Sequence, residues 1–152
     1  MARFTIRVYG LLLHQGKVLV ADEIIKGQRV TKFPGGGLEY GEGTKECLVR
    51  EISEEIGVEA FDVKHFYTTD FFQRSTFHTE EIQVLSIYYT FHVHAPEALP
   101  VVATPFDFSE VMQGAEAFRW LPVAASTEAD LHLPIDRVVL RLLKGVPSAG
   151  MP

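Results

Sequence analysis

Alternation of hydrophobic and polar residues predicts most of the secondary structure of this chain. Near the start, Phe4, Ile6 and Val8 alternate with polar residues, a period of two that is typical of a strand with one buried face. Loops are expected at residues 22–28, and residues 104–114 fit either a loop or a short helix. By the same criteria, strands are predicted at residues 4–13, 17–21, 29–33, 61–72, 81–93 and 117–121.

A helix is predicted from residue 44 to residue 56. Thr44 is in position to cap its N-terminus, and Gly57 is typical of the position that follows the last helical residue. At about 100° per residue, four apolar side chains share one arc that we expect to face the core. These side chains are Leu48, Val49, Ile52 and Ile56.

A second helix is predicted to begin at Pro134, which suits the first helical position, and to end at Lys144. Its expected apolar stripe consists of Ile135, Val138, Val139 and Leu142. Residues 146–152 are expected to form a C-terminal tail. Several strands together with two helices predict an α+β fold, in which a mixed β-sheet is sandwiched between α-helices.

Composition narrows the class of protein. The 152 residues suffice for one domain with a substantial core. The net charge of −6 disfavours nucleic acid as the main partner, because binding its backbone requires a basic face. Cys47 is the single cysteine, so no internal disulfide forms, as expected in a reducing compartment. No apolar run approaches the roughly 20 residues that cross a bilayer. We therefore expect a cytoplasmic protein without a membrane partner.

The stretch from Gly35 to Val58 combines three consecutive glycines with a predicted helix that is rich in glutamate. Like charges one helical turn apart repel, at a cost on the order of a few tenths of a kcal/mol per pair. Glu51 and Glu55 are one turn apart with Glu54 beside them, so their carboxylates can converge on one ion. Oxygen ligands favour Mg²⁺ or Mn²⁺, which also bind substrate phosphates. The stretch therefore predicts a divalent metal site that acts on a diphosphate.

The spacing of these residues resembles the Nudix box, the signature of the Nudix hydrolases. Every fixed position of the box is present, in the order Gly36, Glu42, Arg50, Glu51, Ile52, Glu54, Glu55, Gly57 and Val58. The resemblance implies a single Nudix hydrolase domain over residues 1–145, with the Nudix fold. It also implies pyrophosphatase chemistry, in which water cleaves a diphosphate bond.

The resemblance further implies roles for individual residues. Four groups become metal ligands: the carboxylates of Glu51, Glu54 and Glu55 and the carbonyl of Gly35. Either Glu51 or Glu54 is the general base, and Arg50 orients a catalytic carboxylate through charge-assisted hydrogen bonds. Many members use a further carboxylate from outside the box, for which Glu116 is the first candidate and Glu110 the second.

The expected substrate is a nucleoside diphosphate linked to another group. Gly36 and Gly37 let phosphates approach the backbone without intervening side chains. Phe72 is a candidate for stacking on a nucleobase, and Arg29 and Arg74 are candidates for holding phosphate or ribose. Aromatic residues in this region can equally be core or dimer contacts, and a homodimer is compatible with the family.

Two other functions stay open. One is a non-catalytic Nudix-fold sensor that binds a nucleotide or metabolite without turnover, although such proteins usually carry a degraded box. The other is an isomerase of prenyl diphosphates on the same fold, disfavoured because Cys47 lies within the box helix. Gln73 stands where ADP-ribose hydrolases tend to carry proline, which disfavours that substrate.

Overall fold

The computed structural model describes residues 2–146 of the chain. The chain packs as two compact units, each built from segments far apart in sequence. Unit 1 consists of Met1–Leu12 and Pro34–Glu97, and unit 2 consists of Leu13–Phe33 and Ala98–Pro152. Of the tail predicted at residues 146–152, all but Val146 lies outside the described residues.

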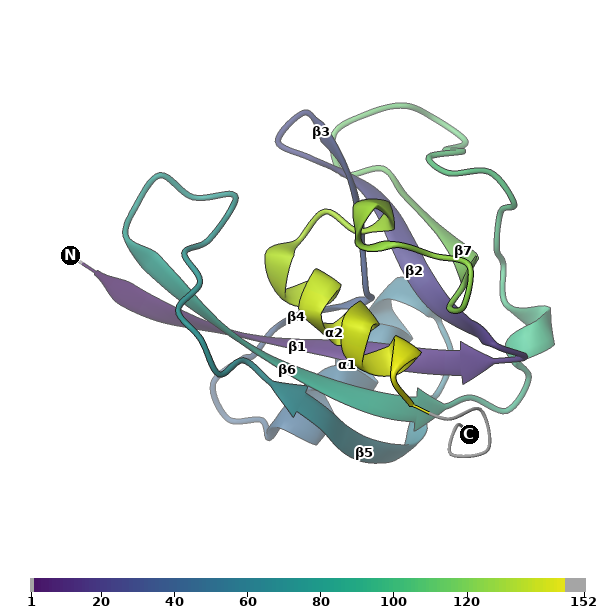
Figure 1. Cartoon of the computed structure of the whole chain (residues 1–152), viewed down its shortest axis with the longest axis horizontal. Coiled ribbons are helices and arrows are strands. Elements are labelled where there is room, and N and C mark those ends of the chain that lie inside the picture. Colours follow the sequence, from purple (N-terminus) through teal and green to yellow (C-terminus); the bar gives the residue numbers. More distant parts are fainter. Residues whose placement is uncertain (1, 147–152) are drawn as a thin grey trace. The chain divides into compact units, whose positions relative to one another are not determined.

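Unit 1 contains a mixed sheet. Strand β1 (Arg3–His14) pairs in parallel with β6 (Ile82–His92). On its other edge β1 pairs antiparallel with the short strand β4 (Gly35–Gly37). Strand β5 (Phe61–Thr68) pairs antiparallel with β6 and ends four residues earlier than predicted. Figure 1 shows β1, β6 and β5 side by side, which confirms the predicted mixed sheet.

Helix α1 (Thr44–Ile56) packs on one face of the unit 1 sheet. A Cβ atom added at Gly10 of β1 would lie 2.8 Å from Leu48 of α1 and 2.5 Å from the ring of Phe91. The helix and the strand thus approach closely because Gly10 has no side chain. Residues alternate between the two faces of a strand, so three more β1 residues share the helix-bearing face: Val8, Ile6 and Phe4.

The buried face of α1 differs slightly from the predicted stripe. Cys47, Leu48 and Ile52 are fully buried, whereas Val49 and Ile56 are only half-buried. The buried arc is turned toward Cys47 because α1 packs against β4 as well as against β6. The single cysteine is therefore part of the core of unit 1.

The ends of α1 show one correction and one confirmation. Gly43, rather than Thr44, occupies the N-cap position, and its N–H donates to Oε1 of Glu46 over 3.0 Å. The Thr44 hydroxyl lies 2.5 Å from the hydroxyl of Tyr89, so it links the helix to β6 instead of capping it. At the other end, Gly57 adopts a left-handed conformation with φ of 78°, as predicted.

Unit 2 is built on three antiparallel strands. Strand β2 (Lys17–Ile25) pairs with β3 (Gln28–Lys32) and with β7 (Glu116–Pro122). The last two residues of β1 pair with the start of β2. The loop predicted at residues 22–28 is wrong, because β2 and β3 occupy most of it. Only a two-residue turn remains, with positive φ at both positions, as a tight hairpin requires.

A buried carboxylate explains why β2 continues beyond its apolar start. Asp22 is fully buried and accepts hydrogen bonds from the Thr31 hydroxyl of β3 and from Nε of Arg119 of β7, each at 2.7 Å. The backbone N–H of Phe106 also donates to this carboxylate, over 3.0 Å. Asp22 therefore joins three strands of unit 2 to the loop before β7.

Helix α2 (Pro134–Lys144) begins and ends as predicted. Its Asp136 accepts a hydrogen bond from the backbone N–H of Phe33 over 3.2 Å, which attaches the helix to the segment after β3. Leu142 was expected to face the core but is 42% exposed. The buried apolar side chains of α2 are Ile135, Val139, Leu140 and Leu143.

The other described segments are loops and two short 3₁₀ helices, η1 (Pro96–Ala98) and η2 (Glu128–Asp130). Residues 104–114 form a loop. The strands and the two α-helices within residues 2–146 confirm the α+β class. None of the helices in this range is long and apolar enough to cross a membrane.

Candidate active site

The glycines of β4 bring the backbone against a carboxylate. Gly36 pairs with Val8, and a Cβ atom added at Gly36 would lie 2.4 Å from the carboxylate of Glu51. At Gly35, with φ of +152°, an added Cβ would lie 2.1 Å from the carbonyl oxygen of Val8. Side chains at these two positions would therefore displace either the strand or the carboxylate. The glycines leave backbone and carboxylate oxygens close together.

Arg50 fixes the loop that precedes α1. Its Nε and Nη2 donate to the two carboxylate oxygens of Glu42 over 2.9 and 2.7 Å, a bidentate pair. Nη2 also donates to the carbonyl oxygen of Gly37 over 3.1 Å. The guanidinium therefore ties the helix to both β4 and the following loop.

The same guanidinium holds two glutamates of the helix. Nη1 of Arg50 donates to Glu51 over 3.0 Å and to Glu54 over 3.2 Å. The side chain of Glu51 is 14% exposed, whereas that of Glu54 is 60% exposed. One cation thus bonds to a sheltered and an open carboxylate. The catalytic role expected for Arg50 stays a prediction.

These contacts shift the pKa values of the groups around Arg50. Hydrogen bonds from Arg50 and from the backbone N–H of Glu39 lower the pKa of Glu42 from 4.5 to about 2. The hydrogen bond to Glu42 also raises the pKa of Arg50. Burial, with Glu42 nearby, raises the pKa of Cys47 to about 12. The Cys47 thiol therefore stays protonated at neutral pH and is not a nucleophile.

The third glutamate of the helix, Glu55, lies in the last turn of α1 and is half-buried. Unit 1 thus presents three glutamates on one helix, of which Glu51 lies beside the backbone of the glycine strand. All of the groups that they offer are oxygens, which suits a hard divalent cation such as Mg²⁺. The close approach of Glu51 to Gly36 fits this donor set, because a side chain at Gly36 would fill the space.

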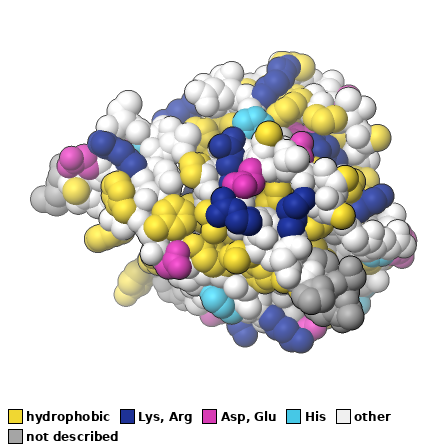
Figure 2. Space-filling view, viewed as in Figure 1, with side chains coloured by type: hydrophobic (Ala, Val, Ile, Leu, Met, Phe, Trp, Pro, Cys, Tyr) yellow, Lys and Arg dark blue, Asp and Glu magenta, His cyan; other side chains and the backbone are white. Residues whose placement is uncertain are grey.

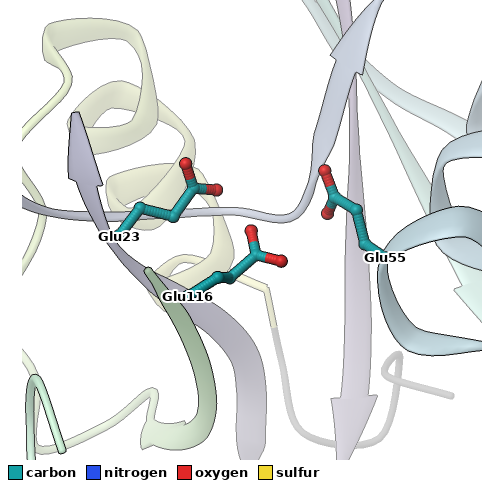
Figure 3. Close-up of side chains that lie close together, drawn as sticks. All are labelled: Glu23, Glu55 and Glu116. Carbon is teal, nitrogen blue, oxygen red and sulfur yellow. The ribbon is translucent and has the colours of Figure 1, made fainter. Parts of the chain in front are cut away.

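A further carboxylate pair lies within unit 2. Glu116, the first residue of β7, is directly opposite Glu23 of β2, and carboxylate oxygens of the two lie within 4.8 Å of each other. Figure 3 shows these two side chains beside each other, and also labels Glu55 on α1. Nζ of Lys32 lies 3.2 Å from the Glu23 carboxylate. These two carboxylates and one ammonium carry a net negative charge.

Sequence reasoning missed Glu23, because it placed residues 22–28 in a loop. The available signal was strand alternation: continued past Ala21, it places Glu23 on a strand beside the segment that contains Glu116. Glu110, the second candidate for a carboxylate outside the box, is exposed in the loop before β7. Arg29, a candidate for substrate binding, is exposed on β3 opposite Ile24.

The other two candidates for substrate binding lie together in unit 1. Phe72 and Arg74 line one pocket with residues from the start of β1 and β6. Both side chains are exposed. The sequence placed these two residues near each other but gave no information about the β1 wall of the pocket.

The family model of the NUDIX domain matches residues 1–143. An RNA pyrophosphohydrolase of Cronobacter sakazakii is 38% identical over 55 residues, a match that covers 36% of this chain and only 30% of that protein.

Solved structures resemble the chain over most of its length. A NUDIX hydrolase from Nitrosomonas europaea has a TM-score of 0.67 at 17% identity, covering 97% of this chain and 95% of that one. A MutT NUDIX hydrolase from Burkholderia pseudomallei has a TM-score of 0.62 at 17% identity, covering 91% and 96%. At such identities the likeness concerns the fold alone. Together with the family match over residues 1–143, it shows that the chain belongs to the Nudix hydrolase family.

Proposed function

We propose that this protein is a Mg²⁺-dependent pyrophosphohydrolase that cleaves the diphosphate bond of a nucleoside diphosphate linked to another group. The observation that carries this proposal is the set of hydrogen bonds from Arg50 to Glu51, Glu54 and Glu42 beside the glycine strand. Such a network orients carboxylates for work on a charged substrate. Glutamates on a helix face that is only exposed to solvent would not require this network of hydrogen bonds.

Glu51, Glu54, Glu55 and the carbonyl of Gly35 are the proposed ligands of Mg²⁺, and Mn²⁺ suits the same oxygens. When bound, the ion would offset the negative charge of the diphosphate and help to position the attacking water. The close approach of Glu51 to the backbone of Gly36 supports this donor set.

In the proposed step, a water oxygen attacks one phosphorus of the diphosphate. The new O–P bond forms as the bond from that phosphorus to the bridging oxygen breaks, and the second phosphate leaves. We assign the general base to Glu54, which takes the proton of the water, because its carboxylate is 60% exposed while Arg50 holds it in place. The backbone at Gly36 and Gly37 is proposed to lie close to the phosphates, because no side chain intervenes there.

Glu116 remains our proposed carboxylate from outside the box. Its support comes from within unit 2, where Glu116 and Glu23 stand directly opposite each other on paired strands. Like charges in such positions are destabilising, so a cation would relieve the repulsion. Glu110 has no comparable neighbour in the contacts of the described residues, which ranks it second. Arg29 is retained as a weaker proposal for phosphate binding.

The partner is proposed to be a small nucleotide derivative. The short match to an RNA pyrophosphohydrolase makes RNA with a 5′ polyphosphate a second substrate class to test. The expectation that nucleic acid is not a partner therefore stays a prediction. Cytoplasmic location, a single domain over residues 1–145 and a homodimer also stay predictions.

A hydrolysis screen tests the proposed function. Nucleoside triphosphates, sugar nucleotides, dinucleotides, damaged nucleotides and RNA with a 5′ polyphosphate are incubated with Mg²⁺ or Mn²⁺, and released phosphate and mononucleotides are measured. We expect turnover of at least one class. Replacement of the base by Glu54→Gln should lower kcat by about 10²-fold or more.

Two variants complete the design. Glu55→Gln should also lower turnover, whereas Glu59→Gln, at an exposed position after the helix, serves as the matched control. Circular dichroism checks that each variant is folded. Near-normal turnover in both Glu54→Gln and Glu55→Gln would contradict the mechanism. Binding of a nucleotide without hydrolysis of any substrate would favour a sensor instead.

A further inference from the structure

A pocket of about 240 Å³ opens on unit 1, away from the glycine strand. Its lining combines apolar, basic, acidic and amide residues: Ala2, Arg3, Phe4, Phe72, Arg74, Glu81, Ile82 and Gln83. In Figure 1 the start of β1 and the turn that precedes β6 lie at the same end of unit 1. Figure 2 shows hydrophobic, basic and acidic side chains together at that end of the view.

The walls of the pocket are fixed by backbone hydrogen bonds. Strand β1 lies along one edge of β6, with Phe4 opposite Gln83. The segment around Arg74 lies along the other edge, where Ser75 donates to the carbonyl of Ile82 over 2.8 Å. Ile82 itself is 1% exposed. The pocket is therefore held between three hydrogen-bonded segments and does not depend on a flexible side chain.

Its chemistry is unusual for a surface of this acidic protein. Phe4 is 73% exposed and Phe72 is 71% exposed, although both are large apolar residues. Among the described residues, the guanidiniums of Arg3 and Arg74 make neither an ion pair nor a side-chain hydrogen bond. Phe4, Gln83 and Arg74 lie on one face of the paired strands, and Glu81 also lines the pocket. Exposed rings beside a guanidinium favour a planar ligand that carries acceptor groups.

The pocket also has a defined position relative to the box. Phe4 and Val8 lie on the same face of β1, the face against which α1 packs, and Val8 pairs with Gly36. Four residues of a strand span about 13 Å. A phosphate bound at Gly36 and a group in the pocket would therefore be separated by about one extended nucleotide. The occupant is the part of the substrate remote from the bond that breaks.

We propose that this pocket is the nucleobase subsite of the enzyme. The base stacks on Phe72 and Phe4, and Arg74 and Gln83 bond to its edge, where guanidinium and amide groups read ring acceptors. This inference rests on the proposed function, because it names the part of the chain that selects the substrate. It adds Phe4 and Gln83 to the two residues expected from the sequence.

Direct binding tests the subsite without hydrolysis. Calorimetry in EDTA measures the affinity of GMP, AMP and UMP, with ribose 5-phosphate as the probe that lacks a base. We expect the mononucleotides to bind more tightly than ribose 5-phosphate. Phe72→Ala and Arg74→Ala should each weaken nucleotide binding by about 5- to 100-fold, the range for loss of one stacked base contact.

Matched controls lie close by or in the other unit. Phe71→Ala removes a neighbouring exposed ring that does not line the pocket, and Arg141→Ala removes an exposed arginine of α2. Both should bind GMP as the unchanged protein does. Glu54→Gln should lose turnover but keep GMP binding, so failure of the subsite and failure of the proposed reaction give different results.

Two outcomes would overturn the subsite. One is equal affinity for GMP and ribose 5-phosphate, or GMP affinity that Phe72→Ala leaves unchanged. The other is a dimer in analytical ultracentrifugation that Phe72→Ala converts to monomer, with no measurable nucleotide binding in either protein. That second result would assign the exposed rings to contact with a second copy of the chain.

Discussion

At the residue scale, Arg50 connects the loop before α1 with the carboxylates of Glu51 and Glu54. Its bidentate pair with Glu42 uses Nε and Nη2, which leaves Nη1 for Glu51 and Glu54. A lysine could not make this set of bonds, because a single ammonium lacks the planar fork of the guanidinium. Glu42 therefore holds the guanidinium in the orientation that reaches Glu51 and Glu54.

The pKa of Glu42 gives a prediction for stability against pH. The folded value, about 2, lies below the ordinary 4.5, so the Glu42–Arg50 bonds stabilise the fold fully above pH 4.5. This contribution should decline as the pH falls from about 4.5 to about 2, because the unfolded state binds the proton first. Urea unfolding of the unchanged protein and of Glu42→Gln across this range measures the difference.

The expected result is a difference in unfolding free energy that is largest near neutral pH and shrinks in acid. Glu46→Gln is the matched control, because Glu46 also lies at the start of α1 but bonds to the backbone of Gly43. A difference between unchanged protein and Glu42→Gln that stayed constant from pH 7 to pH 2 would rule out the ion pair as its source.

At the scale of the secondary-structure elements, local signals predicted the helices well and one hairpin poorly. Pro134 and Gly57 are local signals, and the helices that they delimit begin and end within one residue of the prediction. The second half of β2 has no such signal, since Asp22 resembles a loop residue. The partner that makes it a strand residue, Arg119, is 97 residues away. Sequence patterns do not show such a contact.

The candidate site divides in the same way. Helix periodicity placed Arg50 on the same side of the predicted helix as the glutamates, because side chains three and four residues apart are neighbours. Sequence positions do not show which distant strands pair with each other. The neighbourhood of Glu23 and Glu116 was therefore not predicted. The pocket wall formed by Phe4 was missed for the same reason, since it depends on the parallel pairing of β1 with β6.

Removal of the buried charge in unit 2 should be costly. In Asp22→Asn, Arg119, whose side chain is 11% exposed, loses its charged partner. Breaking a buried ion pair by removing one member costs about 3–5 kcal/mol. We expect a loss of this size in the free energy of unfolding from urea denaturation. Asp107→Asn, at an exposed position in the same unit, is the control and should change stability by less than about 0.5 kcal/mol.

Equal stability of Asp22→Asn and Asp107→Asn would show that the network around Asp22 contributes little. A large loss in Asp22→Asn alone would confirm that β2, β3 and β7 depend on this one carboxylate. The second result would also explain why the loop before β7, which bonds to Asp22 through Phe106, adopts a defined course.

At the scale of the whole molecule, the stability of the fold in the presence of Mg²⁺ tests which carboxylates bind the ion. The chain carries an excess of negative charge, so a bound cation should stabilise it. A ligand that binds only the folded state stabilises it by about 2.7 kcal/mol at a hundred times its Kd. Mg²⁺ should therefore raise the urea midpoint of the unchanged protein, and Glu55→Gln should reduce that rise.

The carboxylate from outside the box can be identified in the same experiment. Glu116→Gln should weaken the response to Mg²⁺ as Glu55→Gln does, whereas Glu110→Gln should respond as the unchanged protein does. Loss of the response in Glu110→Gln alone would show that Glu110, and not Glu116, is the carboxylate from outside the box. A normal response in both variants would show that all of the ligands lie within the box. Glu23→Gln adds a further distinction. Because Glu23 pairs with the buried ammonium of Lys32, its replacement should lower stability without Mg²⁺. If Glu23 binds the ion as well, the response to Mg²⁺ also falls; if it does not, that response is unchanged.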